Sequence, residues 1–332
     1  MIILSNASGL PANWTAWNGE RGQSIFAPTL SKLLEHIRDC DLVLIHSDPN
    51  LLLQLSALFI AAPFLRRPLL ASETTLRKPE GLSRQLTAPV KRLLLSRVNH
   101  FMHLFPDLSG YSKAFGIGPE RSSFIVSKPN LRYRCSAEPN PEGEYILCLG
   151  WSLRDFDTFF AAVERLPYPA AIAKPDWAQL RRHGARFTRP LDRLPSQVRV
   201  VDHNPADPQS QVDLIMGAKL VVVPLLRSCL VQAGTPYNAM LFGKCVILTE
   251  GPAINGLFTN EVLPVPPEDP EALAAVIDRA WNDKELREKT AAAGYRCAAE
   301  LGGEAELAQR FIDQAVRWYR GEPTPENCRC FA

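Results

Sequence analysis

Short apolar runs alternate with helical patterns along the chain. The segment TLSKLLEHIRD, for example, places Leu30, Leu33 and Ile37 at helical spacing. Strands that alternate with helices favour parallel sheets whose strands are joined by crossover helices, so the pattern predicts an α/β fold. In the first half, the runs expected to form strands are MIILSN, LVLIHS, PLLASE, HFMHLF and FIVSKP.

A linker divides the chain into two such halves. Residues 127–145 are rich in Pro, Asn, Glu and Gly and have no hydrophobic period, which is typical of linkers. We therefore expect two doubly wound, Rossmann-like domains, 1–136 and 137–310, and a C-terminal helix and tail, 311–332, that returns toward the first domain. The strands expected in the second half are EYILCLG, AAIAKP, VRVVDH, LVVVPL and CVILTE.

The longest apolar stretch, from Leu51 to Leu65, is interrupted by Gln54, Ser56 and Pro63. A membrane-spanning helix needs about twenty predominantly apolar residues, and this stretch is shorter. It is therefore predicted to be a buried helix between two strands.

The segment from Val221 to Glu250 reads as a strand, a loop, a short helix and a second strand. Its first apolar run ends at Pro224, and Thr235 is a plausible N-cap with Pro236 in the first helical position. Ligands of open α/β sheets lie beyond the carboxyl ends of strands, and a helix N-terminus attracts anions. The segment Gln232–Asn238 is therefore predicted to bind a phosphate-bearing ligand.

This segment resembles the donor-binding element of glycosyltransferases with the GT-B fold, in particular the retaining glycosyl transferases group 1 family. That family has a strand ending in Pro, a loop, Glu-Ala-Met, Gly-Lys and Val-Ile. The matching residues here are Pro224, Asn238-Ala239-Met240, Gly243-Lys244 and Val246-Ile247, whereas Leu230 and Asn238 stand where the family usually has two glutamates.

The resemblance implies two Rossmann-like domains facing a cleft, in the GT-B architecture. It implies a nucleotide-sugar donor on the second domain and a glycan, lipid-linked or other acceptor on the first. It also implies hexosyl transfer with retention of configuration, as in polysaccharide biosynthesis. The donor-binding residues expected from the resemblance and from strand ends are Gly9, Gly150, Arg154, Lys174, His203, Arg227, Gln232, Ala233, Gly234, Thr235 and Asn238.

Several of these residues also have a purely structural interpretation. Arg154 matches a family lysine that binds the donor diphosphate, but it could simply lie at a solvated helix start. Thr235 could serve only as a helix cap, and His203 could be a surface histidine beside Asp202 rather than a partner of the nucleotide base. Asn238 would offer its side chain to ribose hydroxyls where the family uses a carboxylate.

Two candidate catalytic residues end strands of the first half. His46 ends LVLIHS and Glu73 ends PLLASE, so both are expected at the ligand-facing edge of the sheet. His46 could orient the sugar or contact the acceptor, and Glu73 could bind an acceptor hydroxyl or act as a general base. A structural role for each remains the alternative.

Charge and cysteine content exclude several classes of protein. A net charge of +2 on 332 residues gives no support for nucleic-acid binding. The eight scattered cysteines and the absence of a signal-peptide pattern indicate a cytoplasmic protein with reduced thiols. The basic residues Lys91, Arg92 and Arg97 would allow peripheral contact with the inner face of a membrane, or would form a solvated helix face.

No metal cofactor is expected, because Asp155 and Asp157 have the spacing of an Asp-x-Asp metal motif but open a helix. Two other functions stay open. The chain could be a catalytically inactive GT-B-like subunit that binds a nucleotide or a glycan, which the missing glutamates favour. A sugar-nucleotide epimerase is the weaker alternative.

Overall fold

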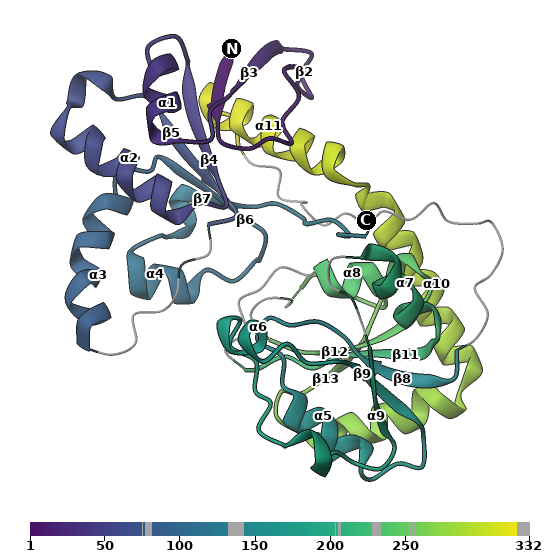
Figure 1. Ribbon diagram of the computed structural model, residues 1–332. Coiled ribbons are helices and arrows are strands. Elements are labelled where there is room, and N and C mark those ends of the chain that lie inside the picture. Colours follow the sequence, from purple (N-terminus) through teal and green to yellow (C-terminus); the bar gives the residue numbers. More distant parts are fainter. Residues whose placement is uncertain are drawn as a thin grey trace. The chain divides into compact units, whose positions relative to one another are not determined.

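The computed structural model describes most of the chain as two compact units. One unit contains Met1–Val126 and the last helix, α11 (Glu304–Arg320), and the other contains Ser127–Gly303 (Figure 1). We call them unit 1 and unit 2. The described residues are 1–74, 76, 82–131, 143–202, 204, 207–227, 234–251, 254 and 256–323, with residues 82–86 described by their backbone only.

Unit 1 is built on a seven-stranded sheet. All neighbouring strands run parallel except β2, which pairs antiparallel with β3. The predicted α/β fold with a parallel sheet is confirmed for this unit. In sheet order the strands are β2 (Asn13–Thr15), β3 (Arg21–Phe26), β1 (Ile2–Ser5), β4 (Leu42–His46), β5 (Leu69–Ser72), β6 (His100–His103) and β7 (Ser122–Phe124).

The sequence pattern predicted a helix directly after β1. The structure instead has the β2–β3 hairpin at this place. Both hairpin strands lie largely exposed at the edge of the sheet, so they carry no apolar run that would reveal them. Trp14 is the buried residue of β2, and a Cβ on Gly22 of β3 would lie 2.1 Å from its ring. The hairpin is therefore held by an indole packed on a glycine, a pattern that strand periodicity does not detect.

Five helices of the described part of the chain accompany this sheet. The apolar stretch that begins at Leu51 forms α2, whose buried face includes Leu52, Leu55 and Phe59, as predicted. Among the described residues, no helix combines the length and apolar content needed to cross a bilayer. The helices are α1 (Leu30–His36), α2 (Pro49–Ala61), α3 (Leu82–Leu95), α4 (Ser109–Phe115) and α11, with short 3-10 turns at Pro63–Leu65 and Pro119–Arg121.

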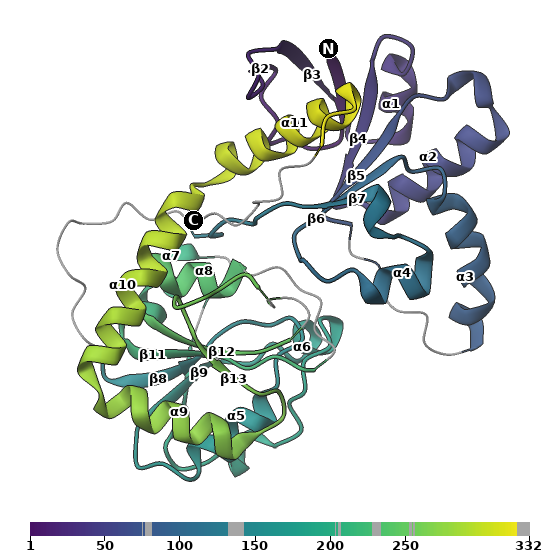
Figure 2. The same ribbon diagram turned by 180° about the vertical axis from the view of Figure 1, so that it is seen from behind.

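Helix α11 packs on the sheet of unit 1 although it ends the chain. Its fully buried Ile312, Ala315 and Val316 share a core cluster with Ile3 of β1 and Leu44 of β4. Figure 2 shows the helix lying along β1 and β3. It extends from Glu304 to Arg320.

Unit 2 is built on a six-stranded parallel sheet, which confirms the second predicted parallel sheet. Helices α5 and α9 cover one face, and α7, α8 and α10 lie on the other (Figures 1 and 2). In sheet order the strands are β10 (Val198–Val201), β9 (Ala170–Ala173), β8 (Tyr145–Cys148), β11 (Ala218–Val223), β12 (Cys245–Thr249) and β13 (Leu263–Val265). The helices are α5 (Phe156–Val163), α6 (Trp177–Arg182), α7 (Pro208–Met216), α8 (Gly234–Leu241), α9 (Pro270–Asn282) and α10 (Lys284–Leu301), with a 3-10 turn at Leu191–Arg193.

Candidate functional site

Each sheet has a topological switch point, where open α/β sheets commonly bind ligands. In unit 2 the chain proceeds from β8 to β9 and β10 on one side, and then returns to the other side of β8 with β11. In unit 1 the switch point lies between β1 and β4, because β3 occupies the other side of β1. The residues that follow these strands are therefore the first candidates for ligand binding.

Arg154 is fixed in place after β8. Its side chain is 3% exposed, and Nε donates to the carbonyl of Leu149 (2.8 Å) while Nη1 donates to that of Ser152 (2.7 Å). Nη2 donates to the Thr235 hydroxyl at 2.8 Å, so the guanidinium joins the loop after β8 to the first turn of α8. A planar guanidinium oriented in this way is well suited to bidentate contact with phosphate.

Gly150 makes room for this guanidinium. Its φ of +103° lies in the region that L side chains rarely adopt, and a Cβ there would lie 2.3 Å from Nη2 of Arg154. The structure therefore brings together three residues that the sequence singled out separately: Gly150, Arg154 and Thr235.

Helix α8 begins at Gly234, one residue before the predicted N-cap Thr235. Thr235 is thus inside the first turn, where its hydroxyl accepts from Arg154 rather than only capping the helix. Pro236 also lies in this first turn, where a missing N–H costs nothing because the first N–H groups of a helix have no intrahelical acceptor. The predicted donor-binding residues Gln232, Ala233 and His203 lie outside the described residues.

Asn238 forms hydrogen bonds within unit 2. Its Oδ1 accepts from the backbone N–H groups of Asn130 (2.6 Å) and Leu131 (3.1 Å), and the residue is 3% exposed. The oxygen predicted to meet a ribose therefore holds the segment Ser127–Leu131 against α8. This contact joins residues more than one hundred positions apart, so no local pattern could have predicted it.

An ion-pair network lies beside Arg154. Asp155, 1% exposed, caps α5 through the N–H of Thr158 (3.1 Å) and forms a bidentate ion pair with Arg186. Hydrogen bonding to Asp155 raises the pKa of Arg186. Glu268 then bridges Arg186 (3.2 Å) and the exposed Arg227 (3.3 Å), another predicted site residue. No local sequence pattern indicates that these residues form one network.

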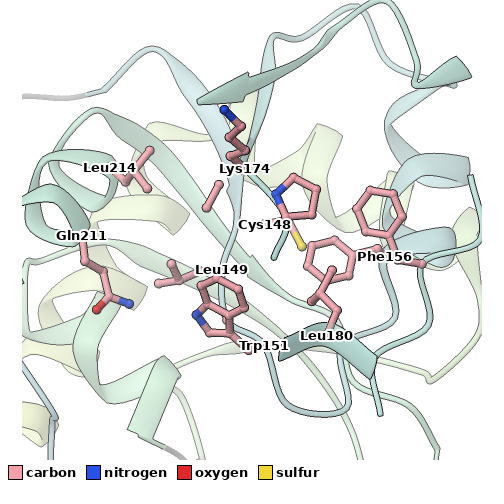
Figure 3. Close-up of a pocket in the computed structure, with 12 residues that line it drawn as sticks. Cys148, Leu149, Trp151, Phe156, Lys174, Leu180, Gln211 and Leu214 are labelled. Carbon is pink, nitrogen blue, oxygen red and sulfur yellow. The ribbon is translucent and has the colours of Figure 1, made fainter. Parts of the chain in front are cut away.

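A pocket opens at the carboxyl ends of β8 and β9. Figure 3 shows Leu149, Trp151 and Leu180 lying together, with the polar side chains of Lys174 and Gln211 on different sides of them. Lys174, a predicted site residue, is exposed and forms an ion pair with Asp202 at 3.0 Å. The pocket is lined by Cys148, Leu149, Gly150, Trp151, Phe156, Ala173, Lys174, Pro175, Leu180, Phe187, Gln211 and Leu214.

In unit 1, the two predicted catalytic residues lie side by side. Nε2 of His46 is 3.3 Å from Oε2 of Glu73, and Nδ1 is 3.0 Å from the Ser72 hydroxyl. Burial lowers the pKa of His46, against a smaller opposing effect of Glu304. A neutral imidazole then donates from Nε2 to the carboxylate and accepts from Ser72, because a carboxylate can only accept. Ser72 is fully buried, so it orients the imidazole and is not exposed to a substrate.

Asn6 fixes the backbone of His46 at the switch point of unit 1. Its Nδ2 donates to the His46 carbonyl (2.9 Å), and its Oδ1 accepts from the His46 N–H (2.7 Å). Sequence reasoning missed Asn6 and Ser72, although both sit at strand ends on the same edge. Gly9, which it did name, lies in the turn before β2, and a Cβ there would meet no atom within 4 Å. The backbone therefore gives no reason for a glycine at this position.

Among the described residues, no group of three or more His, Cys, Asp or Glu side chains is placed to hold a metal ion.

Comparison with known proteins gives a fold but no sequence family. No family model matches the chain, and no curated protein matches it. HepE of Anabaena, solved in complex with UDP-glucose, is 14% identical and superimposes with a TM-score of 0.63, covering 95% of this chain and 99% of that chain. Sucrose-phosphate synthase of Thermosynechococcus elongatus is 15% identical with a TM-score of 0.61, covering 97% of this chain and 89% of that one.

A third structure of this kind is the UDP-forming α,α-trehalose-phosphate synthase of Burkholderia xenovorans, in complex with glucose-6-phosphate. It is 15% identical with a TM-score of 0.55, covering 86% of this chain and 75% of that chain. All three have two parallel-sheet domains of the GT-B type. Across nearly its whole length, therefore, the chain has the GT-B fold.

Proposed function

We propose that the chain is a glycosyltransferase that moves a sugar from a nucleoside-diphosphate sugar to an acceptor hydroxyl. The observation that carries this proposal is the buried Arg154 guanidinium, fixed against Gly150 and bonded to Thr235 at the start of α8. It lies at the switch point of a parallel sheet, where anionic ligands of such folds bind. The complexes of HepE with UDP and with UDP-glucose, which share this fold, support the choice of donor.

Arg154 and the first turn of α8 would stabilise the leaving diphosphate. Negative charge develops on that group as the bond to the sugar breaks, and preorganised donors aimed at it lower the barrier. The N–H groups of Gly234 and Thr235 belong to the first turn, where no intrahelical acceptor exists, and the helix dipole adds positive potential. These groups can act without a metal ion, and we propose that none is required.

The nucleoside would lie over the mouth of the pocket beside this turn, because the cavity itself is too small to enclose it. Trp151 and Leu149 offer apolar surface for a planar base, while Gln211 and Lys174 offer polar groups for the base or the ribose. Gly150 both lines this pocket and contacts Arg154, so a base over the pocket would have its phosphates close to the guanidinium.

The acceptor would bind at the strand-end edge of unit 1, at His46 and Glu73. A carboxylate paired with a neutral imidazole is suited to accept a hydrogen bond from a sugar hydroxyl. The finer assignments rest on the sequence resemblance: a hexosyl donor, a glycan or lipid-linked acceptor, and retention of configuration.

Replacement of Arg154 by Met tests the proposal. The substitution keeps an unbranched apolar stem but removes the charge and the five donors of the guanidinium, so turnover of the donor should fall about a hundredfold or more. The measurement is release of nucleoside diphosphate from a panel of nucleotide sugars with candidate acceptors. Arg287→Met is the matched control, because Arg287 is also buried (6% exposed) and donates to carbonyls, those of Ala280 and Trp281, at the end of α9.

The Arg287→Met protein should turn over the donor at the wild-type rate once its lower stability is allowed for. Wild-type turnover in folded Arg154→Met protein would rule out the proposed role of the guanidinium.

A nucleotide- or glycan-binding subunit without transferase activity is the second candidate. One observation favours it: Asn238 stands where the resembling family has a glutamate, and its oxygen is engaged by the backbone of Asn130 and Leu131. The two candidates differ in one measurement. Tight binding of a nucleoside diphosphate by the wild-type protein, with no turnover of any nucleotide sugar in the panel, would favour the binding subunit.

A further inference from the structure

Glu73 has an unusual backbone conformation directly after β5. Its φ is +51°, in the left-handed region that residues other than glycine rarely adopt. Its N–H donates to the carbonyl of Met102 at 3.0 Å, and its carboxylate lies 3.3 Å from Nε2 of His46. Because φ sets the direction of the Cα–Cβ bond relative to the preceding strand, ordinary backbone angles would point the carboxylate away from the imidazole. The pairing of His46 with Glu73 therefore depends on whatever holds this conformation.

The hydroxyl of Tyr111 holds the residues that follow Glu73. It donates to the carbonyl of Thr74 (3.0 Å) and accepts from the N–H of Leu76 (2.8 Å), which joins α4 to the segment after β5. Burial raises the pKa of Tyr111 to about 12, so the hydroxyl keeps its proton at physiological pH and makes both bonds. The backbone on the carboxyl side of Glu73 is thus tied to a helix of the same unit.

The ring of Tyr111 is 3% exposed and packs among other aromatic rings. Its centroid lies 5.4 Å from that of His103, 5.2 Å from that of Phe105 and 5.9 Å from that of Phe115. A phenylalanine would fill this place equally well and would not bury a hydroxyl, which is costly unless the hydroxyl is hydrogen-bonded. The two bonds to the backbone are therefore the feature that distinguishes tyrosine from phenylalanine at this position.

We propose that Tyr111 is a positioning residue, whose hydroxyl keeps Glu73 in the left-handed conformation in which its carboxylate meets His46 and receives the acceptor hydroxyl. The inference rests on the proposed function, because the acceptor role of His46 and Glu73 comes from it. A strand-end rule does not find Tyr111, since the residue lies on a helix and acts through the backbone of another residue.

The first measurement needs no substrate. With ¹⁵N-labelled histidine, the Nε2–H proton of His46, assigned with His46→Gln, reports the hydrogen bond to Glu73, because a proton donated to a carboxylate resonates downfield of one donated to water. In folded Tyr111→Phe this signal should move toward its position in Glu73→Ala, where the bond is absent. Addition of Tyr111→Phe to Glu73→Ala should cause no further change, because the hydroxyl acts through Glu73.

Tyr145→Phe is the matched control. Tyr145 is also a buried tyrosine (6% exposed), and its hydroxyl donates to a backbone carbonyl, that of Leu214 at 2.7 Å, but it lies in unit 2. Its replacement also removes a buried hydroxyl and its hydrogen bond, and should leave the His46 signal at the wild-type position.

The second measurement uses the donor and acceptor that the panel of nucleotide sugars identifies. Tyr111→Phe should raise the KM for the acceptor about tenfold or more, because a displaced carboxylate no longer meets the acceptor hydroxyl. The KM for the donor should stay unchanged, because the proposed donor contacts lie in unit 2. Tyr145→Phe should leave both constants at their wild-type values.

A third comparison does not require a folded Tyr111→Phe protein. Glycine adopts a positive φ at no steric cost, whereas alanine does not. In the otherwise wild-type protein, Glu73→Gly should therefore unfold at a higher urea concentration than Glu73→Ala. A lower concentration for Glu73→Gly would show that residue 73 is not held in the left-handed conformation, and the inference would be wrong.

The outcomes separate this inference from the proposed function. If folded Tyr111→Phe keeps the wild-type His46 signal or the wild-type KM for the acceptor, Tyr111 only contributes to the core of unit 1 and the inference is wrong. The proposed function survives either result provided that Arg154→Met loses turnover. If the wild-type protein turns over no nucleotide sugar, the proposed function and the acceptor role of Glu73 fall together, and the His46 signal still decides whether Tyr111 positions the pair.

Discussion

His103 is a buried histidine whose imidazole has no hydrogen-bond partner. It is 1% exposed, and neither Nδ1 nor Nε2 has a partner among the described residues. The ring stacks on Phe101 at 5.8 Å and meets Phe105 and Tyr111 at 5.1 and 5.4 Å. Burial lowers its pKa to about 4, so the ring is neutral at physiological pH and behaves as one more aromatic of this cluster.

Replacement of His103 by Phe should therefore stabilise unit 1. It removes two unsatisfied polar atoms and keeps the aromatic contacts, so the free energy of unfolding should rise by about 1 kcal/mol near pH 7. Urea unfolding measures the change. His100→Phe is the control, because His100 is also buried on β6 but Nε2 lies 2.9 Å from the Ser123 hydroxyl. That change leaves a buried hydroxyl without its partner and should destabilise the unit.

The same substitution has a pH dependence with a definite sign. The unfolded chain binds a proton at each histidine below about pH 6.5, whereas native His103 does so only near pH 4. The free energy of unfolding of the wild-type protein should therefore fall as the pH drops from about 6.5 toward 4. This decrease should be smaller in His103→Phe. An equal decrease in both proteins would show that native His103 takes up its proton as readily as the unfolded chain.

At the scale of elements, the sequence predicted the strands that form apolar runs, the partly exposed β10 included, and missed β2, β3 and β13. Strands such as β11 and β12 are apolar on both faces, so they appear as continuous runs. The hairpin strands β2 and β3 are mostly exposed, and β13 has only three residues and contains Pro264. These short or exposed strands form because they pair with a neighbouring strand. A local sequence pattern carries no information about that pairing.

Some residues of the candidate site could be predicted from the sequence, and others could not. His46, Glu73 and Gly150 were named because each ends a predicted strand, and Arg154 because it matches a lysine of the resembling family. The structure pairs His46 with Glu73 and Gly150 with Arg154. The partner of Asn238 could not be found, because it lies in a segment far away in sequence. Position relative to a strand can thus be read from a sequence, whereas the identity of a long-range partner cannot.

Asn238→Ala should destabilise unit 2. The substitution leaves the buried N–H groups of Asn130 and Leu131 without their acceptor, which should cost about 2 kcal/mol or more in unfolding free energy. Asn238→Asp keeps the acceptor and should retain most of the stability. The exposed Asn282→Ala, at the end of α9, should change the stability by less than about 0.5 kcal/mol. A loss of nucleotide affinity in Asn238→Ala with unchanged stability would instead indicate the ribose contact expected from the sequence.

At the scale of the whole molecule, the N-terminal and C-terminal segments of the chain complete one unit. Helix α11 supplies Phe311, Ile312 and Val316 to the core of unit 1, and Phe311 meets the ring of His46 edge-on at 5.4 Å. On the surface, Asp313 accepts from the N–H of Trp17 at 2.9 Å, and Arg317 lies 3.7 Å from the Trp17 ring. The last helix therefore supports both the sheet and a candidate catalytic residue of unit 1.

Ile312→Ala should consequently loosen unit 1 and leave unit 2 unchanged. Ile312 is fully buried, and truncation of a buried isoleucine costs about 2–5 kcal/mol. Hydrogen exchange followed by mass spectrometry should show faster exchange in β1 and β4, and wild-type exchange in β8 and β11. Ile277→Ala is the matched control, since Ile277 is equally buried on α9 in the core of unit 2 and should give the reverse pattern.

The comparison of these two variants shows whether α11 unfolds cooperatively with unit 1 or with unit 2. Ile312 lies far from β1 and β4 in sequence. Its replacement can therefore affect hydrogen exchange in those strands only through the packing of α11 on the sheet. If Ile312→Ala instead loosens the strands of unit 2, or loosens both units equally, α11 is not part of the cooperative core of unit 1. His46 would then depend for its orientation on its contacts with Asn6, Ser72 and Glu73.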